Sequence, residues 1–316
     1  MPELPEVETI RRGLRPQVRG RVVGDVVISA SRVLQNDPED FARALKGQPV
    51  EEIRRRGKNL LFDFPRHCCL VHLGMTGQLT FRDPQRSDSQ EFVRHETTGL
   101  QRARQHSPDR HTHLQFLFQD GTAMLYRDIR QFGKIFLYPR GSSELRSYLD
   151  GLGLEPFGEE YRLQAFAKGL RGRKVAVKSI LLDQKFVAGV GNIYADEALF
   201  EARIHPLRPV SGLKNAEKES LFQAVPLVLE RGLHFGGTSL RDYIDSEGRQ
   251  GSNQEELKVY GRDGRPCRQC GTAIEKIVVS QRGTHFCPQC QGRYRPRKSR
   301  RKAKSAPRRA GGRAQH

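Results

Sequence analysis

The chain begins with Met1-Pro2-Glu3-Leu4-Pro5-Glu6-Val7-Glu8-Thr9, a stretch that leads into a predicted helix. Pro5 suits a first helical position, and acids follow it in the first turn. Val7, Ile10 and Leu14 share one helical face. If Met1 is removed, the nitrogen of Pro2 becomes a free secondary amine. Such an amine can attack an aldehyde or an opened sugar and form an iminium.

Glu3 follows Pro2 directly, so a carboxylic acid lies within reach of whatever the nitrogen attacks. The alternative is an ordinary capped helix in which Glu6 and Glu8 are solvated acids. The nine residues alone leave both interpretations open.

Composition indicates a protein that binds a polyanion. The 316 residues suffice for two or three domains, and the formal charge is +19. Eleven Lys and Arg residues lie between residue 293 and the end, and setting them aside leaves +8 on the rest. No apolar run is long enough to span a membrane, and the start lacks the apolar core of a signal peptide.

Residues 1–150 are predicted to form a β-sandwich with flanking helices, because short apolar and β-branched runs alternate with turn residues. Residues 83–110 are polar and predict a long surface loop. Cys68 and Cys69 are neighbours on one predicted strand and are interpreted as packing thiols. The pair His111-x-His113 has no nearby acid or cysteine, which favours a hydrogen-bonded histidine over a metal ligand.

Residues 151–258 are predicted to be a helical domain that binds nucleic acid. Gly189-Val190-Gly191-Asn192 reads as a tight turn between two helices, with Asn192 as the cap of the second. Backbone N–H groups at such a helix start can face a phosphate. Arg173 and Lys178 could add charge there; the alternative is that both are solvated surface charges.

Residues 259–292 predict one structural zinc ion on a two-stranded hairpin. Cys267-x2-Cys270 and Cys287-x2-Cys290 have the spacing of a four-thiolate site, which leaves no open position for catalysis. The intervening turn carries Gln281-Arg282-Gly283. Chance cysteines are the weaker alternative. Residues 293–316 are predicted to be a disordered basic tail.

These features together resemble the bacterial formamidopyrimidine-DNA glycosylases, the helix–two-turn–helix branch of base-excision repair enzymes. The resemblance runs from Pro2 to about Gln291. The motifs that carry it are PELPEVETIRRGL from Pro2, GKNLLF around Lys58, HLGMTGQL around Met75, RDIRQFGK around Arg130, DQKFVAGVGNIYADEALF around Asn192, VYGRDGRPC before the zinc site and QRGTHFCPQC within it. An α+β multidomain fold is implied.

The resemblance implies a role for each matching residue. Pro2 matches the nucleophile that forms a Schiff base with C1′, and Glu3 the acid that assists sugar opening. Lys58 matches the lysine of β-elimination, and Arg282 the arginine of δ-elimination. Three further residues match the family side chains that fill the space left by the extruded base: Met75, Arg130 and Phe132. Phosphate contacts are matched by His111, Arg173, Lys178 and Asn192.

The implied activity is a bifunctional DNA glycosylase and abasic-site lyase that excises oxidised purines from duplex DNA. One structural zinc ion, damaged double-stranded DNA, no membrane, a monomer and a cytoplasmic, nucleoid-associated bacterial location are expected with it. Two alternatives remain: the same chemistry on oxidised pyrimidines, as in the endonuclease VIII branch, or a binding protein in which Met1 is retained.

Three departures from the family pattern stand out. The loop at 83–110 is longer than usual, and the tail past Gln291 is additional. In the loop 241–257, which in this family closes over the lesion, Asn253 stands where relatives often carry an aromatic residue. The presence of this loop favours oxidised purines, whereas Asn253 puts its grip on the base in doubt.

Overall fold

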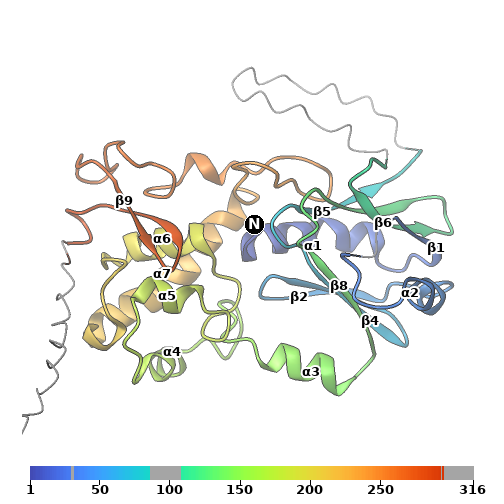
Figure 1. The fold of residues 1–316 in the computed structure, drawn as a ribbon, viewed down its shortest axis with the longest axis horizontal. Coiled ribbons are helices and arrows are strands. Elements are labelled where there is room, and N and C mark those ends of the chain that lie inside the picture. Colours follow the sequence, from blue (N-terminus) through green and yellow to red (C-terminus); the bar gives the residue numbers. More distant parts are fainter. Residues whose placement is uncertain (30–31, 86–107, 293, 295–316) are drawn as a thin grey trace, which may run out of the picture.

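Within the described residues, two four-stranded antiparallel sheets build one half of the protein, at the right of Figure 1. The computed structural model describes residues 1–29, 32–85, 108–292 and 294. One sheet has the order β1-β6-β7-β5, formed by β1 (Val23–Ile28), β6 (Thr112–Phe118), β7 (Ala123–Asp128) and β5 (Gly77–Arg82). The other has the order β2-β3-β4-β8, formed by β2 (Glu52–Arg56), β3 (Asn59–Asp63), β4 (His67–His72) and β8 (Lys134–Pro139). The predicted sandwich is confirmed.

Helix α1 (Leu4–Val18) joins the sandwich to the helical half of the protein. Val7, Ile10 and Leu14 are fully buried in the core that the two sheets share. Leu4, at the start of the helix, instead belongs to the core of the helical half. The amino terminus therefore lies where the two cores meet, as Figure 1 shows. The helix begins one residue earlier than predicted, because Glu3 and Glu6 form a capping box.

The helical half contains the predicted helix–turn–helix. Its helices are α4 (Leu163–Leu170), α5 (Val177–Leu182), α6 (Asn192–Glu201) and α7 (Asn215–His234). Helix α3 (Ser143–Asp150) precedes them, and α2 (Pro38–Leu45) lies on the sandwich with Asp37 as its predicted cap. The prediction that Asn192 caps α6 is wrong by one residue, since Gly191 holds that position. Short 3-10 turns occur at Val210–Gly212 and Asn253–Glu255.

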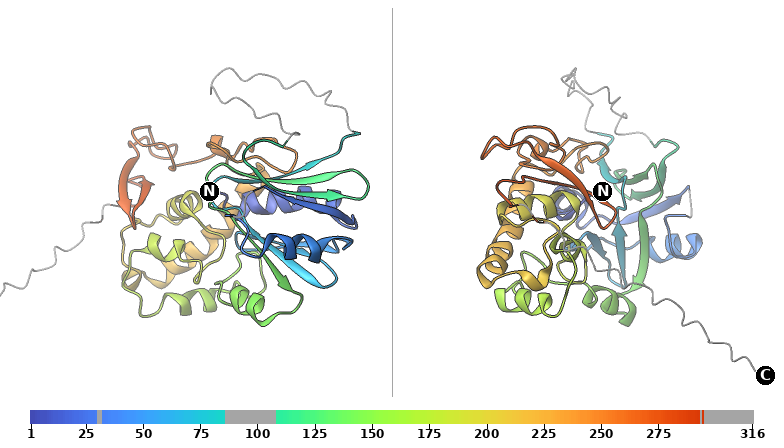
Figure 2. Two further views of the ribbon diagram at one scale, coloured as in Figure 1. Left: turned by 45° about the vertical axis from the view of Figure 1, so that its right-hand side comes forward. Right: turned by 60° about the vertical axis from the view of Figure 1, so that its left-hand side comes forward.

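The C-terminal hairpin consists of β9 (Glu275–Val279) and β10 (Arg282–Phe286), and both views of Figure 2 place it beside the helical half. Ser280 and Gln281 form its turn, with positive φ angles of 48° and 59°. Arg282 is therefore the first residue of β10. The prediction that it belongs to the turn is wrong.

Some predictions lie outside the described residues. These are most of the loop 83–110, of which 86–107 are not described, and the tail 293–316 apart from residue 294. Among the described helices, none combines the length and apolar character that crossing a membrane requires.

Candidate active site

The Gly189–Asn192 turn holds the side chain of Glu3. The Glu3 carboxylate accepts hydrogen bonds from the backbone N–H groups of Gly191 at 2.7 Å, Ile193 at 2.9 Å and Tyr194 at 3.4 Å. A Cβ on Gly191 would lie 2.4 Å from the Glu3 carboxyl carbon, so only glycine permits this approach. The prediction that these N–H groups face a phosphate is therefore wrong, because Glu3 occupies them.

A second buried carboxylate supports the segment that carries Pro2. Glu6 accepts hydrogen bonds from the Glu3 N–H, the Thr238 N–H and the Tyr194 hydroxyl, each at 2.8 Å. Burial raises the pKa of Glu6, and the neighbouring charge of Glu3 raises it further. The alternative of solvated acids is excluded, since Glu6 and Glu8 are 1% and 8% exposed. Pro2 itself is buried, directly before Glu3.

Lys58 lies on the turn between β2 and β3 and is 7% exposed. Burial lowers the pKa of its ammonium group, whereas the charges of Glu3 and Glu6 raise it and that of Arg282 lowers it. The turn packs against the segment that holds Glu3, since a Cβ on Gly57 would lie 3.1 Å from the Ala188 Cβ and 3.4 Å from the Gly189 nitrogen. The turn is held by Glu155, whose carboxylate accepts a hydrogen bond from the Gly57 N–H at 2.8 Å.

Arg282 is exposed at the start of β10, and the strand behind it is anchored to α5 and α6. Lys178 donates to the Thr284 hydroxyl at 2.8 Å and lies 2.6 Å from the Asp196 carboxylate. Asn192 donates to the Gly283 carbonyl at 3.0 Å. Lys178 is fully buried, so the alternative of a solvated surface charge is excluded for it. A phosphate contact by Lys178 would require it to exchange one of these partners, and it stays a prediction.

Met75, Arg130 and Phe132 project from two adjacent turns of the sandwich. Met75 is 37% exposed and Phe132 is 53% exposed, so the two turns present neighbouring apolar side chains at the surface. The Arg130 guanidinium lies 4.6 Å from the centre of the Phe132 ring. The expected trio is thus together and accessible to a partner.

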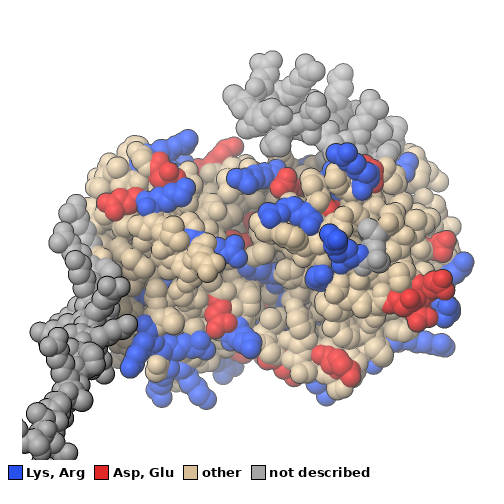
Figure 3. Space-filling model, in the orientation of Figure 1, with Lys and Arg blue, Asp and Glu red and all other residues tan. Residues whose placement is uncertain are grey.

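Two further expected phosphate contacts lie at the surface of the protein. Arg173 is exposed and pairs with Asp183 at 3.2 Å, and His111 is half-buried. His113 is buried, with its ring Nε2 2.8 Å from the Asp128 carbonyl, so the hydrogen-bonded interpretation of this histidine is confirmed. Lys and Arg side chains gather on the face in Figure 3, including the band between the two halves.

Asn253, which departs from the family pattern, is turned into the protein. It is 2% exposed and donates to the Thr238 hydroxyl at 2.8 Å. The Thr238 hydroxyl is in turn 3.1 Å from that of Tyr194, a partner of Glu6. In this conformation Asn253 anchors one end of the loop 241–257 and does not present its side chain to a base.

The four predicted cysteines form a site for one structural zinc ion. The sulfur atoms of Cys267, Cys270, Cys287 and Cys290 all lie within 4.8 Å of one another. Two of the Sγ–Sγ distances are 3.9 and 3.5 Å, close to the ~3.8 Å edge of a tetrahedron with Zn–S bonds of about 2.3 Å. The N–H groups of residues 269 and 290 each lie 3.4 Å from a cysteine sulfur, as suits thiolate ligands. Cys68 and Cys69 are buried in β4, distant in sequence from the zinc site, as the interpretation as packing thiols predicts.

Removing zinc is expected to unfold the hairpin and displace Arg282 while the sandwich stays folded, because the sandwich has its own core. Hydrogen exchange should speed up across residues 264–291 after chelation, and strand cleavage should fall by at least about tenfold. Unchanged exchange in β10 after verified loss of zinc would contradict this prediction.

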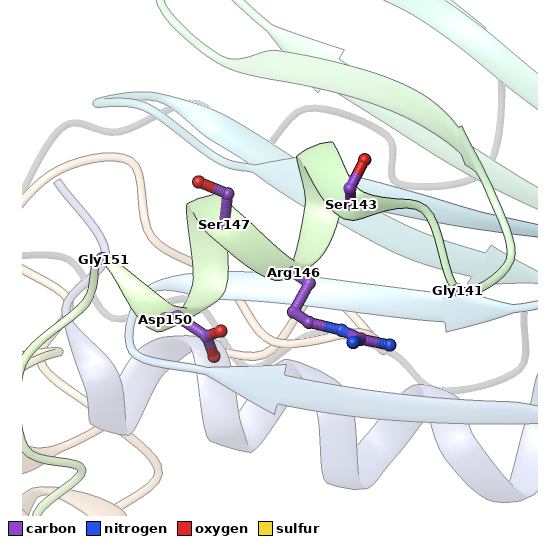
Figure 4. Close-up of a pocket in the computed structure, with 6 residues that line it drawn as sticks. All are labelled: Gly141, Ser143, Arg146, Ser147, Asp150 and Gly151. Atoms are coloured by element: carbon purple, nitrogen blue, oxygen red, sulfur yellow. The ribbon is translucent and has the colours of Figure 1, made fainter.

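One hollow of the surface contains none of these residues. It runs along α3 and is lined by Gly141, Ser143, Arg146, Ser147, Asp150 and Gly151 (Figure 4). The expected catalytic residues Pro2, Glu3, Lys58 and Arg282 instead lie on the amino terminus, the β2–β3 turn and the zinc hairpin. Together, fold and site define a class: a basic zinc-finger protein of the nucleic-acid-binding kind, with buried titratable groups at its amino terminus.

Comparisons with known proteins agree over nearly the whole chain. Family models match residues 1–135 (formamidopyrimidine-DNA glycosylase N-terminal domain), 152–243 (formamidopyrimidine-DNA glycosylase H2TH domain) and 264–293 (zinc finger found in FPG and IleRS). The chain is 42% identical to the formamidopyrimidine-DNA glycosylase of Enterococcus faecalis, over 92% of the chain and 97% of that protein. It is 40% identical to that of Shouchella clausii, over 93% and 100%. The chain therefore belongs to the formamidopyrimidine-DNA glycosylase family of DNA repair enzymes.

Solved structures show the same architecture. The Lactococcus lactis Fpg in complex with abasic-site DNA has a TM-score of 0.81 and 32% identity, covering 92% of this chain and all of that one. MutM (FPG) from Thermus thermophilus has a TM-score of 0.78 and 38% identity, covering 93% of this chain and all of that one.

Several residues that build the site were not predicted from the sequence. Glu155, Asp128 and Asp196 are ordinary acids in the chain, yet each is a buried acceptor that positions an expected site residue or its turn. A weak signal was available for Asp128 and Asp196, because both lie inside the quoted motifs. Glu155 lies outside those motifs and gave no such signal.

Proposed function

We propose that this protein excises oxidised purines such as 8-oxoguanine and formamidopyrimidines from duplex DNA, and then cuts the strand by β,δ-elimination. The observation that carries the proposal is the convergence on residues 188–192. Glu3, directly after the buried Pro2, accepts from the Gly191 N–H, the turn of Lys58 packs on Ala188, and Asn192 donates to Gly283, the neighbour of Arg282. Four groups from three distant parts of the chain thus have a use in this chemistry.

The first step needs an amine and an acid. The lone pair of the Pro2 nitrogen forms a bond to C1′, and the glycosidic bond breaks as the base leaves with its electron pair and takes up a proton. Glu3 gives a proton to the ring oxygen, the sugar opens and the iminium forms. The three N–H groups that hold Glu3 fix its carboxyl group for this transfer.

Strand cleavage follows from the iminium, which acts as an electron sink. Lys58 takes a proton from C2′, and the 3′ phosphate leaves as its C–O bond breaks. A second proton loss then expels the 5′ phosphate, with Arg282 stabilising the departing charge. The protein is finally released by hydrolysis of the remaining iminium.

The target nucleotide must leave the base stack for C1′ to be reached, at a cost of a few kcal/mol. Met75 and Phe132 enter the vacated space, and Arg130 faces the orphan base, which offsets part of that cost. His111, Arg173, Lys178 and Asn192 contact the phosphates of the bent duplex, and the basic face supports this role.

A panel of duplex oligonucleotides tests the lesion class. We expect excision of 8-oxoguanine to exceed that of thymine glycol and strand cuts to carry phosphate at both ends. Preference for thymine glycol would instead support the oxidised-pyrimidine alternative, and binding without any cleavage would support the non-enzymatic one.

The rate of strand cleavage is expected to depend on pH through Lys58. Burial lowers the pKa of Lys58, so its neutral amine is populated at lower pH than that of an exposed lysine. We expect the cleavage rate of a preformed abasic site to rise with pH and level off below the ordinary lysine value of 10.5. Lys58→Arg should abolish this rise, since a guanidinium stays protonated. Indistinguishable pH–rate profiles for the two proteins would refute the role of Lys58.

The protein is further proposed to act as a monomer in the bacterial cytoplasm, associated with the nucleoid. Sedimentation at catalytic concentrations and imaging in cells measure these two properties.

A further inference from the structure

The turns that carry Met75, Arg130 and Phe132 are packed against each other. One joins β4 to β5 and the other joins β7 to β8, and a Cβ on Gly74 would lie 2.5 Å from backbone atoms of Phe132 and Gly133. Gly74 has a φ of +62°, so a side chain there would also strain the backbone. The two turns therefore have to be held in one relative position.

The Asp128 carboxylate links them, alongside one direct hydrogen bond from the Arg130 N–H to the Thr76 hydroxyl at 3.1 Å. Asp128 is fully buried at the end of β7, where its Cα pairs with that of Gly77. Its Oδ1 accepts a hydrogen bond from the Thr76 hydroxyl at 2.5 Å and from the Arg130 N–H at 3.2 Å. Its Oδ2 accepts from the Gly133 N–H at 2.8 Å and from the Tyr126 hydroxyl at 3.2 Å.

Three of these four donors lie beside the exposed side chains. Thr76 follows Met75, the Arg130 donor is its own backbone, and Gly133 follows Phe132. Among the described residues, no cation pairs with the Asp128 side chain, so its negative charge is balanced by these four donors alone. Burying a carboxylate without a cation costs desolvation free energy, which an apolar residue in the same space would avoid. The presence of Asp128 therefore indicates that its hydrogen bonds position the two turns.

We propose that Asp128 is the positioning residue that sets Met75, Arg130 and Phe132 in one register for entry into the duplex. This inference rests on the proposed function of that trio. Asn at this position keeps the shape but turns an NH2 group toward two of the four donors. Both turns would then shift relative to each other while the sandwich keeps its core.

The test compares two substrates for Asp128→Asn. Excision of 8-oxoguanine from duplex DNA requires the trio to enter the stack, whereas cleavage of a preformed abasic site in single-stranded DNA does not. Under single-turnover conditions we expect the duplex rate to fall by at least about tenfold and the single-strand rate to stay within about twofold. Met75→Ala should show the same split between the two substrates.

Controls separate positioning from general damage. Asp63→Asn removes another buried carboxylate of the sandwich, the partner of Arg54 at 2.7 Å, and should leave the ratio of the two rates unchanged. Thr76→Val removes the two hydrogen bonds of the Thr76 hydroxyl, to Asp128 and from the Arg130 N–H, and keeps the carboxylate. It is expected to show a smaller split between the two substrates, and it carries the test if Asp128→Asn does not fold. The fluorescence of 2-aminopurine opposite the lesion, which reports entry of the trio, should change in both Asp128→Asn and Thr76→Val.

Equal losses on both substrates, or no loss on either, would overturn the role of Asp128. If the unmodified protein cleaves neither substrate, the proposed function itself fails, which is a distinct outcome.

Discussion

One residue left in front of Pro2 is expected to lower strand cleavage of damaged duplex DNA by at least about 10³-fold. Acylation makes the proline nitrogen part of a peptide bond, and resonance removes the lone pair that attacks C1′. DNA affinity should change by less than about threefold, because phosphate contacts distant from the amino terminus supply most of it.

The matched control is the same extended protein after a protease has removed the extension and left Pro2 first. Cleavage should return in full, measured on one 8-oxoguanine duplex with the N-terminus verified by mass spectrometry. Undiminished cleavage by a protein that retains Met1 would contradict the role of Pro2.

The second large effect is expected for Glu3→Gln. The amide cannot give the proton that opens the sugar, and its NH2 group faces backbone donors that now bind a carboxylate oxygen. Excision of 8-oxoguanine should fall on the order of 10²–10⁴-fold, the usual contribution of a positioned acid.

Strand cleavage at a preformed abasic site should suffer much less, by no more than about tenfold, because its sugar already opens spontaneously to the aldehyde. Time courses on the two substrates with the same enzyme preparation measure this difference. Equal losses would mean that Glu3 supports the fold of the site and does not act as the acid.

The sandwich and the zinc hairpin were predictable because their signals are local. Alternating strands and turns marked the first, and the spacing of Cys267, Cys270, Cys287 and Cys290 marked the second. Strand β2 has a weaker local signal, because Glu-Ile-Arg-Arg-Arg has a single apolar residue and its charges are paired by partners from other elements. Strand β5 begins at a glycine, which also weakens its signal.

The environment of the site depends on contacts between distant segments, which no local pattern encodes. Gly191 reads as part of a phosphate turn until Glu3, 188 positions away, is seen to occupy its N–H group. Lys178 is enclosed by Asp196 and β10, which excludes the alternative of a solvated surface charge. For the glycine turn, sequence reasoning identified the functional element and assigned its N–H groups the wrong partner; for Lys178 it did not provide the buried partners.

Reductive trapping tests the central claim most directly. The protein with Pro2 first would be mixed with 8-oxoguanine duplex in the presence of borohydride, and the covalent product digested and sequenced by mass spectrometry. Our account predicts an adduct in which the sugar is attached to the nitrogen of Pro2. Absence of any adduct, or attachment to a lysine such as Lys58, would contradict it.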